Sequence, residues 1–76
     1  MASKPVFTIE TRYTNDGIIV GNIHVGNALV FQHRMNAGGY WWEGRPYLER
    51  AMDEEEARQL TLNKFGERLA DLLNAN

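Results

Sequence analysis

The sequence has no cysteine and no long apolar run. The missing thiols exclude disulfides, thiolate nucleophiles and thiolate metal sites. Nowhere do eighteen apolar residues stand together, so no helix long enough to span a membrane is predicted. The first ten residues, MASKPVFTIE, lack the apolar stretch of a signal peptide. We therefore expect a soluble, cytoplasmic protein.

Residues that could carry chemistry are also few. The chain has a single serine, Ser3, and no base stands at a recognisable spacing from it. The glycines form neither a dinucleotide-binding fingerprint nor a phosphate-binding loop. His24 and His33 are the only histidines, and a zinc site needs three or four ligands. The sequence thus predicts a protein that is not an enzyme, with no catalytic residues, no metal site and no cofactor.

Basic residues do not strongly outnumber acidic ones in either of the two parts of the chain. Residues 1–50 carry five basic and four acidic side chains, whereas residues 51–76 carry three basic and six acidic ones. These sums of +1 and −3 give the net charge of −2. Binding to phosphates draws its affinity from many lysines and arginines. A protein partner is therefore expected before a nucleic acid.

Three segments have the alternating pattern of half-buried strands, at residues 6–13, 18–25 and 28–35. The sequence TNDG suits a three-residue hairpin loop with glycine in the left-handed position, and Gly26-Asn27 marks a second tight turn. If both turns take three residues, one face of the sheet collects these apolar side chains: Phe7, Ile9, Tyr13, Ile19, Ile23, Val25, Leu29 and Phe31. Residues 36–39 are read as a loop, and a fourth strand is expected to begin in the following segment, GGYWWEGRPY.

The last third of the chain predicts one helix, over residues 53–74. Asp53 and Glu56 have the spacing of a capping box, which places the start of the helix at about Glu54. A stripe at helical spacing is expected to cover the sheet: Leu62, Phe65, Leu69, Leu72 and Leu73. Gly66 interrupts this run, which suggests either a close approach to the sheet or a kink.

The chain is therefore predicted to be a single α+β domain over residues 1–76. A short tail (1–5) precedes an antiparallel meander of three to four strands (6–50), and the C-terminal helix (53–74) packs on one face. The small size of the chain leaves room for about one layer of helix against one sheet.

A single helix leaves the other face of the sheet open, and this face is the predicted binding surface. Adjacent residues on a strand point to opposite sides, so one tryptophan of GGYWWEGRPY is expected in the core and the other on the open face. The mixture of arginine, aromatic and aliphatic side chains is typical of protein contacts. The candidate partner-binding residues are Arg12, Ile18, Val20, Val30, Arg34, Trp41, Trp42, Arg45 and Tyr47.

Two resemblances bear on function. The order of three strands and a helix, with Asp53, Glu55, Glu56 and Ala57 at the helix start, resembles the AP2-type and integrase arm-type DNA-binding domains, whose sheets read DNA. In size, acidity and lack of cysteine and catalytic residues, the chain is similar in kind to small phage and mobile-element inhibitors of bacterial defence, such as anti-CRISPR proteins. That resemblance implies an inhibitor that occupies a surface of a larger complex. A nucleic-acid binder using the open sheet face and a dimeric structural module remain the alternatives.

Overall fold

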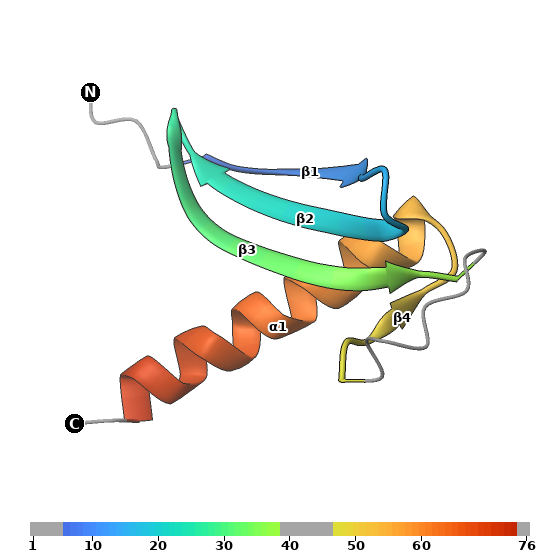
Figure 1. The fold of residues 1–76 in the computed structure, drawn as a ribbon. Helices are drawn as coiled ribbons and strands as arrows, with labels where there is room; N and C mark the ends of the chain where they lie inside the picture. Colours follow the sequence, from blue (N-terminus) through green and yellow to red (C-terminus); the bar gives the residue numbers. More distant parts are fainter. Residues whose placement is uncertain (1–5, 39–46, 75–76) are drawn as a thin grey trace.

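The computed structural model describes residues 6–38 and 47–74, which form one sheet and one helix (Figure 1). The strands lie in the order β1-β2-β3-β4, and the helix crosses one face of the sheet. The predicted α+β class, with an antiparallel β1-β2-β3 meander and a C-terminal helix, is confirmed. The elements are β1 (Phe7–Tyr13), β2 (Ile18–Val25), β3 (Ala28–Ala37), β4 (Arg50–Ala51) and α1 (Glu54–Asn74).

The two hairpin turns differ in length. Between β1 and β2, the Thr14 N–H donates to the Ile18 carbonyl at 2.8 Å, which leaves a three-residue loop ending in Gly17 at φ 81°. This is the predicted turn. Between β2 and β3, Val25 pairs with Ala28, so the loop contains two residues and Gly26 has φ 59°. Glycine at the first central position of a two-residue loop is typical of a type II′ turn. The prediction of a three-residue second turn is therefore wrong.

A bulge on β3 compensates for the shorter turn. Ile23 pairs with Phe31 but the next residue, His24, pairs with Leu29, so Val30 is the extra residue. From Phe31 onward the alternation matches the predicted faces again, since one extra residue moves every later side chain to the opposite side. Leu29 lies before the bulge and shares a face with His24, away from the helix. The prediction that Leu29 lies on the apolar face is therefore also wrong.

The fourth strand also differs from the prediction. β3 extends through the predicted loop to Ala37, and β4 pairs with it in parallel, with Asn36 opposite Arg50 and Ala37 opposite Ala51. A parallel pair requires a connection of about a dozen residues, and residues 38–49 supply that length. The sheet is therefore mixed and not wholly antiparallel. The strand predicted to start in GGYWWEGRPY falls mostly on residues 39–46, outside the described residues.

The helix begins at Glu54, as its capping signals predict. The Glu56 N–H donates to Asp53 Oδ1 at 2.9 Å, and the Ala57 N–H donates to the Asp53 carbonyl at 3.0 Å. The Glu56 side chain in turn accepts from the Met52 N–H at 2.7 Å, one residue earlier than in a standard capping box. Asp53 and Glu56 thus satisfy backbone groups that a helix start would otherwise leave unpaired.

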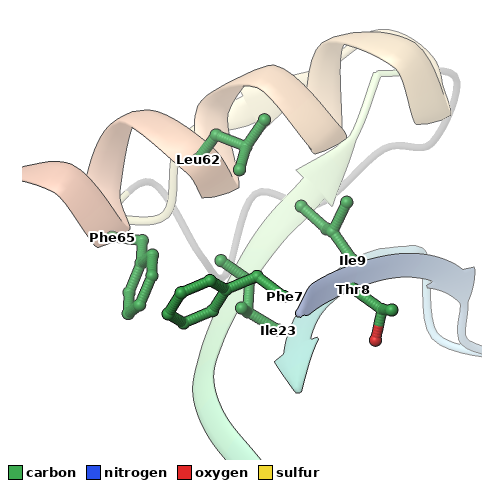
Figure 2. A pocket seen from close by; sticks show the side chains of 6 residues that line it. All are labelled: Phe7, Thr8, Ile9, Ile23, Leu62 and Phe65. Atoms are coloured by element: carbon green, nitrogen blue, oxygen red, sulfur yellow. The ribbon is translucent and has the colours of Figure 1, made fainter. Parts of the chain in front are cut away.

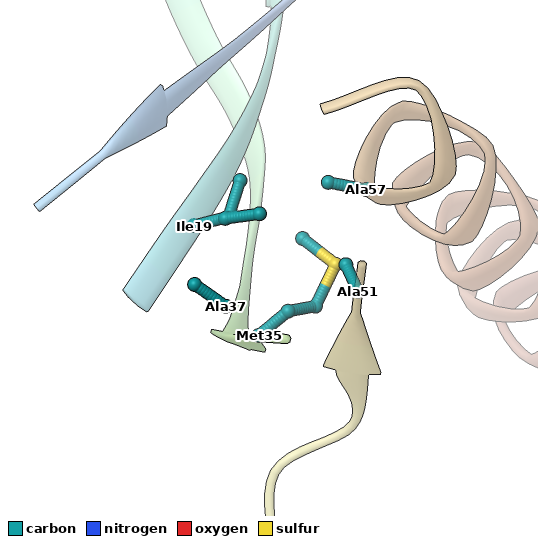
Figure 3. Close-up of a cluster of buried hydrophobic side chains, with 5 residues drawn as sticks. All are labelled: Ile19, Met35, Ala37, Ala51 and Ala57. Carbon is teal, nitrogen blue, oxygen red and sulfur yellow. The ribbon is translucent and has the colours of Figure 1, made fainter. Parts of the chain in front are cut away.

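Small side chains hold the helix against the sheet. Ala57 and Thr61 are its buried residues, and Thr61 Oγ1 donates to the Ala57 carbonyl at 2.7 Å. The helix crosses β2 at Gly21, where an added Cβ would lie 2.8 Å from Thr61 Cβ. Beside this crossing lies the hydrophobic core, which is assembled from the sheet and the helix start (Figure 3): Ile19, Met35, Ala37, Ala51 and Ala57.

Candidate functional site

The predicted binding face is only partly exposed. Arg12 and Arg34 both pair with Val20, so these three side chains share the face away from the helix, as expected. However, Val20 is 5% exposed and Ile18 is 1% exposed. Their predicted role as surface contacts is wrong. Both residues lie on β2, between β1 and β3, and their side chains are packed within the chain instead of presented to a partner.

The other predicted contact residues do not form one described patch. Arg12 and Arg34 are exposed on either side of Val20, and Val30 is exposed at the bulge. Tyr47 is exposed ahead of β4, in a different part of the chain. Trp41, Trp42 and Arg45 lie outside the described residues. Within the part that the structure describes, the open face therefore carries exposed arginines around buried aliphatic side chains, and exposed apolar side chains near the bulge, at Leu29 and Val30.

An apolar groove lies instead between β1 and the helix (Figure 2). Its volume is about 200 Å³. Phe65 projects from the helix toward the sheet. Its ring centroid lies 5.6 Å from that of Phe7 on β1 and 5.3 Å from that of Phe31 on β3. Both distances fall within the range of favourable aromatic contacts. The groove is lined by Phe7, Thr8, Ile9, Ile23, Leu62 and Phe65.

The outer edge of β1 borders this groove. β1 is the first strand in the sheet order, and β2 is its one neighbour among residues 6–38 and 47–74. Antiparallel pairing alternates, and the Thr14 N–H points at β2. The N–H groups two and four residues earlier therefore also face β2, whereas those of Ile9 and Thr11 point outward. An extended segment could pair with these groups, since an unpaired strand edge is a template for another strand.

The leucines of α1 are not where the sequence predicts them. Phe65 of the predicted stripe packs on the sheet, and Leu62 lines the groove beside it. Leu69, Leu72 and Leu73 are 43%, 54% and 77% exposed, so this part of the stripe does not cover the sheet. The buried residues of the helix are Ala57 and Thr61, and the later turns of the helix run past the strands (Figure 1). The close approach at Gly21 fixes this rotation of the helix. The sequence signal that was missed is the pair of small residues one turn apart.

No contact within the described chain requires a glycine at position 66. A Cβ added there would meet nothing within 4 Å, so the expected close approach to the sheet is wrong. The helix also continues without a break from Glu54 to Asn74. Glycine in a helix interior costs about 1 kcal/mol relative to alanine, and no contact inside the described chain offsets this cost.

Polar clusters offer little chemistry among the described residues. His33 Nε2 lies 2.6 Å from Glu49 Oε1, a contact that ties β3 to the segment before β4. No group of three potential metal ligands occurs in residues 6–38 and 47–74. The described helix is also not apolar enough to cross a membrane.

No protein-family model, curated protein or solved structure matches the chain.

Proposed function

We propose that the chain is a non-enzymatic protein-binding module that takes an extended segment of a partner along the outer edge of β1. The observation that carries this proposal is the position of the apolar groove directly beside that edge. In strand addition, main-chain hydrogen bonds supply affinity and side-chain pockets supply specificity. Ile9 and Thr11 offer the outward backbone groups, and the groove offers the pocket.

The size and lining of the groove indicate what the partner presents. A volume of about 200 Å³ is below the range of about 300–1,000 Å³ typical of small-molecule sites. It exceeds the roughly 150 Å³ of an apolar cavity that holds benzene. The groove therefore suits one large apolar side chain from a bound strand, such as leucine or phenylalanine. Such a partner segment would alternate apolar and polar residues.

An inhibitor of a larger complex is one form of this proposal. Such a protein needs an exposed contact surface and no active site. The β1 edge and its groove would serve that purpose in an anti-CRISPR or another anti-defence protein. The small size and the net charge of −2 are in keeping with this role.

Proline at Thr11 is expected to block partner binding without disturbing the sheet. The Thr11 N–H points away from β2, and proline is tolerated on edge strands for this reason. A peptide selected from a random displayed library against the purified protein serves as the probe. We expect Thr11→Pro to weaken the binding of this peptide at least tenfold. This factor corresponds to about 1.4 kcal/mol, on the order of one lost hydrogen bond.

Thr11→Ala is the matched control, because both changes remove the hydrogen bond from Thr11 Oγ1 to Glu54 Oε1 at 2.9 Å. It should leave peptide affinity unchanged. A second variant, Phe7→Glu, places a charge at the rim of the groove and should weaken binding while the circular dichroism stays native. Failure to select any peptide, or equal affinity for Thr11→Pro and Thr11→Ala, would contradict the proposal.

Nucleic-acid binding is the second candidate function, and it would use the sheet face that carries Arg12 and Arg34. Both arginines are exposed and flank Val20. Two arginines neutralise few phosphates, so we expect a random single-stranded 20-mer to bind more weakly than about 10 μM at physiological salt. Fluorescence anisotropy measures this affinity. Sub-micromolar binding that falls steeply with salt would favour the nucleic-acid function over the protein-binding one.

A further inference from the structure

From Leu62 onward, α1 separates its leucines and its charged residues onto two sides. Leu62, Gly66, Leu69 and Leu73 follow each other at intervals of four, three and four residues, which places them on one side of the helix. We call these four residues the leucine face. The charged residues of this part lie on the opposite side: Lys64, Glu67, Arg68 and Asp71. Depletion of charge around exposed apolar side chains is typical of the centre of a protein interface.

The leucine face contains both a projection and a gap. The leucines project from the helix, and Gly66 leaves a gap between Leu62 and Leu69. Nothing in the described chain lies within 4 Å of a Cβ added at Gly66. In an antiparallel pair of identical helices, the residues of one copy meet the same residues of the other in reverse order. Leu69 of one copy can then lie over Gly66 of the other, and the converse contact follows from the two-fold symmetry.

The leucine face is exposed within one chain and matches a second copy of itself. Leu62 and Leu69 are each 43% exposed and Leu73 is 77% exposed. Leu62 and Leu73 lie equally far from the midpoint between residues 67 and 68. In an antiparallel pair, Leu62 of one copy therefore meets Leu73 of the other, and the second copy covers the whole face.

We propose that two copies of the chain form a two-fold dimer through their leucine faces, with the C-terminal halves of α1 antiparallel and Leu69 of each copy over Gly66 of the other. The charged side of each helix stays in solvent. The outward backbone groups of Ile9 and Thr11 are not part of this contact, although Leu62 belongs both to the leucine face and to the groove beside β1. A second copy supplies an apolar face of equal length and leaves no charge buried at the contact.

The molar mass in solution tests the dimer. Light scattering of the full chain should give twice the monomer mass at 100 μM, and Leu69→Glu should give the monomer mass. Leu69 is 43% exposed within one chain, so the fold should survive this change. Leu73→Glu, at a still more exposed position, repeats the test if Leu69→Glu fails to fold. Ala70→Glu adds the same charge on the next residue, beside the leucine face, and should remain dimeric. A monomeric wild-type chain, or dimers of Leu69→Glu and Leu73→Glu, would overturn the proposal.

Alanine at Gly66 tests how the helices pair. The added methyl group meets nothing inside the chain but would fill the gap that Leu69 of the second copy occupies. We expect Gly66→Ala to raise the dissociation constant of the dimer about tenfold, measured by sedimentation equilibrium. An unchanged dissociation constant would overturn the placement of Leu69 over Gly66. Thr11→Pro should leave the dimer intact, which keeps this test separate from that of strand addition.

Discussion

Replacing Gly21 by alanine is expected to lower the free energy of unfolding by about 3 kcal/mol, the upper part of the range for overpacking a close contact. The new Cβ would lie 2.8 Å from Thr61 Cβ and 2.9 Å from Thr61 Cγ2, and nearer still to Oγ1. The helix backbone would have to move away from β2 to relieve this overlap. Total stability for a domain of this length is about 4–11 kcal/mol, so urea denaturation should show a large shift of the midpoint.

A double-mutant cycle with Thr61→Ala separates this clash from other effects of the substitution. Thr61→Ala removes Oγ1 and Cγ2, the two side-chain atoms beyond Cβ that an alanine at position 21 would overlap. The double variant should therefore lose less stability than the sum of the two single variants, by at least about 1 kcal/mol. Additive losses would show that the helix does not cross the sheet at this glycine.

Replacing Ile18 by alanine is expected to destabilise the fold by about 3 kcal/mol, within the usual range for removing a buried isoleucine side chain. Ile18 is almost fully buried although it lies on the face away from the helix. Its loss leaves a cavity beside Asn36, its partner on β3, which is itself buried. Thermal unfolding followed by circular dichroism measures the effect.

Val20 and Val30 provide a matched pair, because the sequence predicts both on the open face. Both were predicted to be surface contacts, yet Val20 is buried and Val30 is exposed. Val20→Ala should cost about 1–2 kcal/mol, by loss of two buried methyl groups and the cavity left behind. Val30→Ala should change stability by no more than about 0.5 kcal/mol. Equally small losses of stability in Ile18→Ala, Val20→Ala and Val30→Ala would show that all three side chains are exposed, as the sequence predicts.

Features that depend on neighbouring residues could be predicted from the sequence. Asp53 and Glu56 determine the start of the helix because their hydrogen bonds reach only three or four residues along the chain. The first hairpin follows in the same way from a glycine in the left-handed position after Asn15 and Asp16. These local signals, together with the change in the spacing of apolar residues from every second residue to the helical period of 3.6, were enough to predict the α+β class.

The candidate site could not be predicted, because its geometry depends on contacts between distant segments. The parallel pairing of β4 depends on where residues 38–49 return the chain. The burial of Val20 on the face away from the helix is likewise not encoded in the alternating pattern of its own strand. The fit of Thr61 against Gly21, forty residues away in sequence, determines which side of the helix faces the sheet. The sequence by itself determined that α1 is amphipathic, and only tertiary packing decided that its leucines stay exposed.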